Sequence, residues 1–209
     1  MKKNFEVEVR GKLTEERYNE LRKLLNRDGK FLGEKDRLSL IYYKNRIPKD
    51  VRDDKGELVD LRVRITNKKL EATVKYGEWG GTDTRKEINI NIDLDKFDDL
   101  INFLTMLGWH LCIALTTKKL VYEYRGTEFT IEKIRDTKYH FEAEILTHYE
   151  DIKKEMDYIS SLLKELKLKP FTEEEHIEQC NKLNSLKDMH FDFLKQSPED
   201  IKMKFKGYF

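Results

Sequence analysis

Cysteine is scarce in this sequence, with two residues, Cys112 and Cys180, among 209. They lie far apart and form neither a CxxC pair nor a Cys/His spacing, which argues against a disulfide framework and against a zinc site. Long apolar runs are also missing, because no stretch approaches the ~20 residues that cross a bilayer. The N-terminus has no signal-peptide core. The composition therefore predicts a cytoplasmic protein with no membrane partner.

An excess of one charge sign is missing as well. Charged residues make up 39% of the chain, yet 41 basic and 40 acidic residues leave a formal net charge of +1. A protein that binds nucleic acid by neutralising phosphates usually carries a basic excess. The bulk charge gives no support for that role, so the many charges must be sorted locally onto particular faces.

Charged and apolar residues alternate strictly in the stretch from Phe5 to Arg10. In a β-strand, Glu6, Glu8 and Arg10 would share one face, and the apolar residues between them would share the other. A strand with its polar side in water gives the same pattern. The alternation recurs, however, in residues 60–65, 71–75, 85–92 and 141–145. Five such strands predict an antiparallel sheet closed on itself, charged within and covered outside by helices.

These stretches resemble the motifs of the CYTH domain family, the triphosphate tunnel metalloenzymes. The family includes class IV adenylyl cyclases, thiamine triphosphatases and inorganic tripolyphosphatases. The matching segments follow the family's order over residues 5–146: Glu6–Arg10 for ExExK, Leu61–Arg64 for LRxR, Thr73–Lys75 for TxK, Arg85–Glu87 for RxE and Phe141–Glu144 for the closing ExE. The resemblance implies an α+β fold, a closed antiparallel eight-stranded β-barrel (the triphosphate tunnel) with flanking helices and a C-terminal helical extension.

The chain is expected to divide into a tunnel domain with its covering helices, residues 1–168, and a helical extension, residues 169–209. Helices are predicted over Tyr149–Leu168 and Glu173–Leu194, separated at Pro170. Aromatic residues close to the C-terminus require cover, either on the parent chain or against a second copy in a homodimer. The short break at Pro170 favours packing on the parent chain.

The resemblance implies two sets of functional side chains. The metal ligands for Mg²⁺ or Mn²⁺ would be, in order of preference, Glu6, Glu8 and Glu144, then Glu142 and Glu132. The phosphate-binding residues would be Arg10, Arg62, Arg64, Lys75, Arg85 and Lys119. The candidate catalytic residues are Arg10, Lys75 and Glu87. Physical chemistry leaves two explanations open for so many charges on one face, because buried ions must be paired or must ligate metals: internal salt bridges, or a bound triphosphate with its metal ion.

The sequence also departs from the family pattern in three places. Arg10 stands where the family has lysine, which keeps the charge but loses an amine whose pKa can shift. In the family's KxR strand, Thr117 takes the lysine position and Lys119 the arginine position. The segment Leu40–Lys44 keeps only the tyrosine pair of the DxYYD motif.

The favoured function is a metal-dependent triphosphatase that hydrolyses inorganic tripolyphosphate or a nucleoside or organic triphosphate, because a water nucleophile requires few dedicated groups. A class IV adenylyl cyclase, in which a ribose 3′-hydroxyl attacks the α-phosphorus of ATP, is the main alternative. An RNA 5′-triphosphatase and a non-catalytic module that binds nucleotide or polyphosphate are further ones. The expected partner is a small-molecule triphosphate, and nucleic acid enters only as a 5′-triphosphate RNA end.

Overall fold

The computed structural model describes residues 5–54, 59–77, 82–134 and 138–209. The chain forms two compact units. Unit 1 consists of Met1–Lys35, Tyr76–Glu87 and Thr117–His176, and unit 2 consists of Asp36–Lys75, Ile88–Thr116 and Ile177–Phe209. Each unit has a hydrophobic core of its own. The domain boundary expected at residue 168 stays a prediction.

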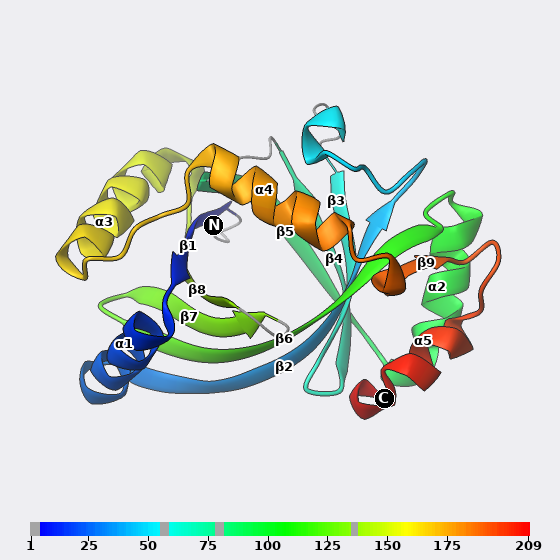
Figure 1. Cartoon of the computed structure of the whole chain (residues 1–209), viewed down its shortest axis with the longest axis horizontal. Helices are drawn as coiled ribbons and strands as arrows, with labels where there is room; N and C mark the ends of the chain where they lie inside the picture. Colours follow the sequence, from blue (N-terminus) through cyan, green and yellow to red (C-terminus); the bar gives the residue numbers. More distant parts are fainter. Residues whose placement is uncertain (1–4, 55–58, 78–81, 135–137) are drawn as a thin grey trace. The chain divides into compact units, whose positions relative to one another are not determined.

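The strands of the described residues form one antiparallel sheet in the order β2-β3-β4-β5-β1-β8-β7-β6-β9. An additional pairing of β2 with β6 closes the sheet into a ring. The expected α+β class with a closed antiparallel sheet is therefore confirmed. The strands, shown in Figure 1, are β1 (Phe5–Leu13), β2 (Lys30–Tyr43), β3 (Val59–Thr66), β4 (Lys69–Tyr76), β5 (Thr82–Ile92), β6 (Leu111–Tyr124), β7 (Thr127–Ile134), β8 (Lys138–Thr147) and β9 (His190–Asp192).

Five α-helices lie in the same described residues: α1 (Glu15–Asp28), α2 (Phe97–Met106), α3 (Ile152–Glu165), α4 (Glu173–Asn184) and α5 (Pro198–Lys204). Helix α1 begins after Thr14, whose hydroxyl accepts a hydrogen bond from the backbone N–H of Arg17 at 3.2 Å. Among the described residues, every helix is too short or too polar to span a lipid bilayer.

Turn chemistry explains where β3 ends and β4 begins. Asn67 and Lys68 both take positive φ angles, 49° and 64°, which suits the tight two-residue turn between β3 and β4. Strand β6 is continuous from Leu111 to Tyr124. Its middle holds Thr116 and Thr117, β-branched residues that favour extended backbone, with no glycine or proline to end the strand.

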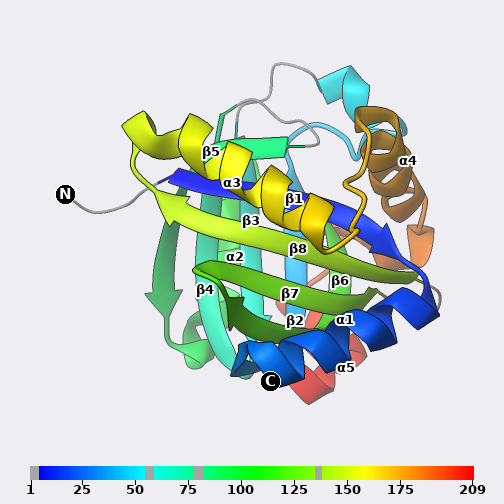
Figure 2. The ribbon, with the colours of Figure 1, turned by 90° about the vertical axis from the view of Figure 1, so that its left-hand side faces the viewer.

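In unit 1, helices α1 and α3 cover one face of the sheet. Figure 2 shows α3 lying along β1 and β8. The buried side chains there include Val7 and Phe141 from the strands, Leu25 from α1 and Ile159 from α3. Each fully buried side chain of this kind contributes about 2 kcal/mol to folding. The opposite face of the same strands carries the charged residues.

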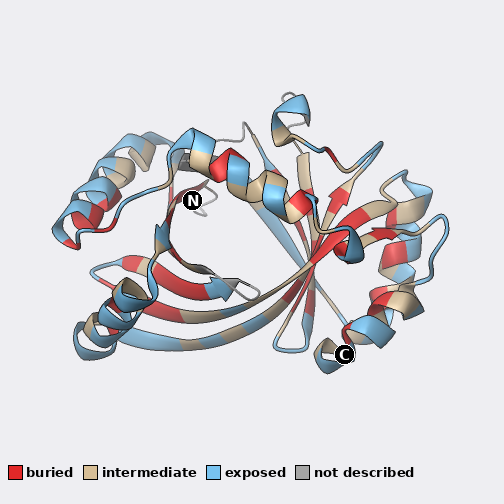
Figure 3. Ribbon diagram, viewed as in Figure 1, coloured by how far each residue is buried: buried red, intermediate tan, exposed pale blue. Residues whose placement is uncertain are grey.

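In unit 2, the C-terminal segment is part of the core. Strand β9 pairs with β6, with Ile113 opposite His190 in the register, and Phe191, Ile201 and Phe205 are buried. Figure 3 shows buried residues along α2 and α5. The terminal aromatic residues are thus covered by their own chain, and the homodimer stays a prediction. The helix predicted to reach Leu194 ends at Asn184, and the short strand β9 follows it.

Candidate functional site

The charged face of unit 1 is organised by the register of its strands. Glu8 lies opposite Glu144 and Arg10 opposite Glu142 across the β1–β8 pair, while Lys119 lies opposite Glu132 across β6 and β7. Residues opposite one another point to the same face of a sheet. The structure therefore brings seven predicted residues onto this face of unit 1, the unit 1 cluster: Glu6, Glu8, Arg10, Lys119, Glu132, Glu142 and Glu144.

Lys119 is the basic centre of β6 in this cluster. Its Nζ lies 2.6 Å from Glu142 and 3.2 Å from Glu132, and its side chain is 11% exposed. Burial raises the pKa of Glu132, and the charge of Lys119 opposes that rise. The neighbouring Lys118 is exposed. The strand therefore presents Lys119, and not Lys118, to the cluster, in agreement with the arginine position that the sequence assigns to Lys119.

Arg10 joins the two acidic strands. Its Nε lies 2.5 Å from Glu8 Oε1 and 3.1 Å from Glu142 Oε1. A guanidinium group stays protonated throughout the physiological pH range. Arg10 therefore supplies a fixed positive charge between two carboxylates and cannot accept a proton from an attacking water.

The carboxyl group of Glu144 is crowded by like charges. Burial, followed by the charges of Glu6 and Glu8, raises the pKa of Glu144 to about 9. A raised pKa of this kind shows that the ionised form lacks sufficient compensating positive charge. Hard carboxylate oxygens are the donors that Mg²⁺ and Mn²⁺ prefer, so the chemistry of these residues fits such an ion.

The arrangement is nevertheless not a closed metal cage. In the described parts of the chain, no group of three His, Cys, Asp or Glu residues converges in the manner of a complete metal site. Mg²⁺ is usually held by only one or two carboxylates, and takes its other ligands from water and from substrate phosphates. The crowded acids therefore fit an open site that substrate would complete.

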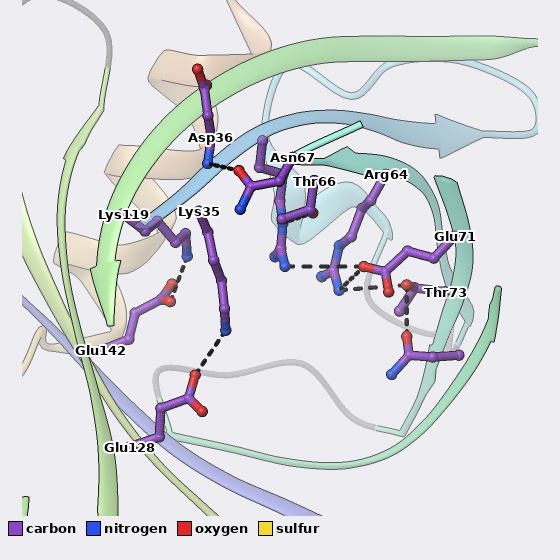
Figure 4. Close-up of polar contacts among 12 residues, drawn as sticks. Lys35, Asp36, Arg64, Thr66, Asn67, Glu71, Thr73, Lys119, Glu128 and Glu142 are labelled. Carbon is purple, nitrogen blue, oxygen red and sulfur yellow. Dashed lines mark hydrogen bonds and ion pairs between the residues drawn. The ribbon is translucent and has the colours of Figure 1, made fainter. Parts of the chain in front are cut away.

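Unit 2 carries a second charged group, the unit 2 cluster. Arg62 donates two hydrogen bonds to Asp60, at 2.8 and 2.6 Å. Arg64, 8% exposed, donates to the Thr73 hydroxyl at 3.4 Å and lies near Glu71 (Figure 4). Lys75 is buried at the end of the same strand as Thr73. Three predicted phosphate-binding residues, Arg62, Arg64 and Lys75, therefore lie on the neighbouring strands β3 and β4 of unit 2.

The remaining predicted residues lie on β5. Arg85 is opposite Glu6 in the register, but its side chain lies outside the described residues. Glu87 is half-buried. Motif matching alone did not assign Arg37 and Glu71 of unit 2, or His140 of β8, which lies opposite Glu132. The period-two alternation indicates Glu71 and His140, because each stands in phase with the charged residues of its strand. Arg37 ends a run of four charged residues, where alternation gives no signal.

Comparison with known proteins gives a family and a set of similar folds. The CYTH domain model matches residues 4–196. No curated protein matches the sequence. The PH1819 protein of Pyrococcus horikoshii has a TM-score of 0.65 and 21% identity, with 85% of this chain and 98% of that chain covered.

Two further structures are described as proposed cyclases. One, from Vibrio parahaemolyticus, has a TM-score of 0.61 and 16% identity, covering 83% of this chain and 93% of its own. The other, HpAC1 from Hippeastrum, is described as having a dominant triphosphatase activity. It has a TM-score of 0.55 and 16% identity, with 80% of this chain and 89% of that chain covered. At these identities the likeness shows the fold. Because the family model spans nearly the whole sequence, this chain belongs to the CYTH domain family, whose shared role is to bind triphosphates.

Proposed function

We propose that this protein is a metal-dependent triphosphatase. The observation that carries the proposal is the crowding of Glu6, Glu8 and Glu144 on neighbouring strands. Burial, followed by the charges of Glu6 and Glu8, raises the pKa of Glu144 to about 9. A divalent cation removes this electrostatic cost, and these three residues would hold Mg²⁺ or Mn²⁺, with Glu132 and Glu142 as secondary ligands. When bound, the ion supplies positive charge to the phosphate oxygens.

The basic residues supply the rest of the charge that a triphosphate requires. Guanidinium groups such as those of Arg62 and Arg64 bind phosphate oxygens in a bidentate manner, and Lys75 adds a point charge. Arg10 and Lys119 already contact carboxylates, and each can exchange a carboxylate oxygen for a phosphate oxygen. Phosphoryl transfer depends mainly on positioning and on neutralising developing charge. In this proposal Arg10 acts electrostatically, and Arg85 is a further phosphate-binding residue of unit 1.

Hydrolysis is favoured over cyclisation. A triphosphatase requires a water molecule near the terminal phosphorus, whereas a cyclase must also hold the nucleoside so that its 3′-hydroxyl reaches the α-phosphorus. The description of HpAC1, a proposed cyclase with a dominant triphosphatase activity, shows that a protein of this fold can hydrolyse in preference. The class IV adenylyl cyclase is the second candidate, supported by the description of the Vibrio parahaemolyticus protein.

Product analysis tests the proposal. The protein is incubated with tripolyphosphate, ATP and a 5′-triphosphate RNA, each with Mg²⁺, with Mn²⁺ or with a chelator. We expect metal-dependent release of orthophosphate from tripolyphosphate or ATP. Formation of pyrophosphate and cyclic AMP would identify a cyclase. Release of orthophosphate from the RNA alone would identify an RNA triphosphatase, and binding without turnover would identify a non-catalytic module.

Two variants link the activity to the acidic site. Glu8→Gln removes a proposed ligand at nearly constant volume, and we expect turnover to fall at least 100-fold at every metal concentration. Glu16→Gln is the matched control, because Glu16 is exposed in the first turn of α1 and loses the same charge. Equal activity of the two variants would contradict the assignment of Glu8.

A further inference from the structure

Arg37 of β2 lies on the same face of unit 2 as the arginines of β3. In the β2–β3 register Arg37 is opposite Thr66 and Ser39 is opposite Arg64, so all four side chains share one face. The Nε of Arg37 donates a hydrogen bond to the Thr66 hydroxyl at 2.8 Å, and its side chain is 18% exposed. Arg37 belongs to none of the sequence motifs, yet it is held in place like a functional residue.

Arg37 and Arg64 converge on a single oxygen atom. The Oε1 of Glu71 lies 4.0 Å from Arg37 Nη2 and 3.9 Å from Arg64 Nη1. Figure 4 shows Glu71 next to Arg64. Both separations exceed hydrogen-bond length, so the contacts are loose ion pairs. One carboxylate thus lies between two guanidinium groups, each of which prefers a closer, bidentate anion.

We propose that Glu71 occupies the place of a phosphate group, and that Arg37 is a further phosphate-binding residue that acts together with Arg64. The inference rests on the proposed function, because it takes a triphosphate as the ligand. A phosphate group presents more oxygen atoms and more negative charge than one carboxylate, so it displaces Glu71 from both arginines. Glu71 keeps the two guanidinium groups neutralised while substrate is absent.

The hydroxyl groups around this pair support the exchange. Thr66 binds Arg37 and Thr73 binds Arg64, while the Thr73 hydroxyl donates to Asn89 Oδ1 at 2.7 Å. These uncharged partners can hold both guanidinium groups in position when Glu71 moves away. Preorganised donors of this kind lower the cost of binding an anion.

The competing explanation is that Arg37, Arg64 and Glu71 form an ordinary structural ion-pair network on three adjacent strands. The two explanations predict different changes in ligand affinity when Glu71 is replaced. In a structural network, loss of either Arg37 or Glu71 harms the same arrangement, so both losses weaken ligand binding or leave it unchanged. If phosphate displaces Glu71, the two losses have opposite effects on ligand binding. Loss of Glu71 strengthens binding because Glu71 competes with phosphate, whereas loss of Arg37 weakens it because Arg37 attracts phosphate.

The test is calorimetric binding of inorganic tripolyphosphate in the presence of a chelator, so that turnover does not contribute. We expect Glu71→Gln to bind about fivefold more tightly than wild type and Arg37→Gln about fivefold more weakly, as for loss of a partly exposed charge contact. Asp99→Asn is the matched control. It removes the same charge from an exposed ion pair with Lys96 in the same unit, and we expect unchanged binding.

Weaker or unchanged binding by Glu71→Gln overturns the proposal, and so does unchanged binding by Arg37→Gln. If melting curves show that Arg37→Gln is unfolded, Arg37→Lys replaces it, with about twofold weaker binding expected from the lost fork geometry. A wild-type chain that binds no tripolyphosphate, with or without Mg²⁺, also overturns it. Failure of the proposed function is a separate result. A chain that binds tripolyphosphate without hydrolysing it still shows tighter binding by Glu71→Gln and weaker binding by Arg37→Gln.

Discussion

Glu144 lies directly opposite Glu8 across the β1–β8 strand pair. Like charges in opposite positions destabilise a sheet, and here burial and the nearby Glu6 add to the cost. The pair therefore lowers the stability of the metal-free protein, and it fixes two carboxylates in neighbouring positions on adjacent strands.

The stability of the metal-free protein should fall as pH rises. The pKa of Glu144 is about 9 in the folded protein, against an ordinary value of 4.5. Between these values the unfolded chain releases a proton that the folded chain retains, so stability present below pH 4.5 is lost progressively up to about pH 9. Thermal melting in a chelator at pH 5.5 and pH 8.5 should show a Tm lower by roughly 5 °C at the higher pH.

Two comparisons identify the source of this pH dependence. Glu144→Gln should melt at a higher temperature than wild type at pH 8.5 and show a smaller shift between the two pH values. Saturating Mg²⁺ should raise the Tm of wild type at pH 8.5 but not that of the variant. A wild-type Tm that rises with pH in the chelator would show that Glu144 is not crowded.

Lys119 should be the stabilising cation of the unit 1 cluster. It contacts both Glu132 and Glu142 and is nearly buried. Lys119→Met leaves two poorly hydrated carboxylates without that charge, so urea unfolding should show a loss of about 3 kcal/mol. Lys118→Met, at the exposed neighbouring position, should change stability by less than about 0.5 kcal/mol. If both variants lost a similar amount of unfolding free energy, the contacts of Lys119 with Glu132 and Glu142 would not be the source of its stabilising effect.

Gly11 allows the chain between α3 and α4 to pass close to β1. A Cβ at Gly11 would lie 2.3 Å from the carbonyl oxygen of Lys169 and 2.4 Å from the Phe141 ring. Next to it, the N–H of Phe171 donates to the carbonyl of Arg10 at 2.8 Å. Gly11→Ala should therefore cost about 3 kcal/mol in urea unfolding, through overpacking against backbone. Gly207→Ala, where the added Cβ would have open space, is the matched control and should be nearly neutral.

The sequence predicted the strands of unit 1 that carry the acidic cluster because their pattern is local. Alternation alone places Glu6, Glu8 and Arg10 on one face, and the resemblance to the CYTH family implied the closed antiparallel sheet. Pairing is not local, however. That Glu8 meets Glu144, or that Lys119 contacts Glu132 and Glu142, depends on strand register, which a single sequence does not specify.

The role of Arg37 and Glu71 shows the second limit of the sequence. Glu71 stands in phase with Lys75 on β4, but this phase gives only the face of the sheet and not the neighbouring side chains. The approach of Arg37 and Glu71 to Arg64 arises because three strands lie side by side in unit 2. The C-terminal strand β9 is a similar case, since three residues are too few for a period to be recognised, and pairing with β6 selects extended backbone.

The C-terminal segment should be required for the stability of unit 2. Ile201 on α5 and Phe205 just after it are 0% and 8% exposed and pack in the core with the strands of β2 and β3. Ile201→Ala should lower the free energy of unfolding by about 3 kcal/mol, and Phe205→Ala by about the same amount. Met203→Ala on the same helix is the control, because Met203 is 63% exposed, and we expect a change below about 0.5 kcal/mol. Urea unfolding followed by fluorescence and circular dichroism measures all three variants. If Ile201→Ala and Met203→Ala unfold at the same urea concentration, the segment does not contribute its buried face to the core, and the aromatic residues near the C-terminus must find their cover elsewhere, in a second copy of the chain.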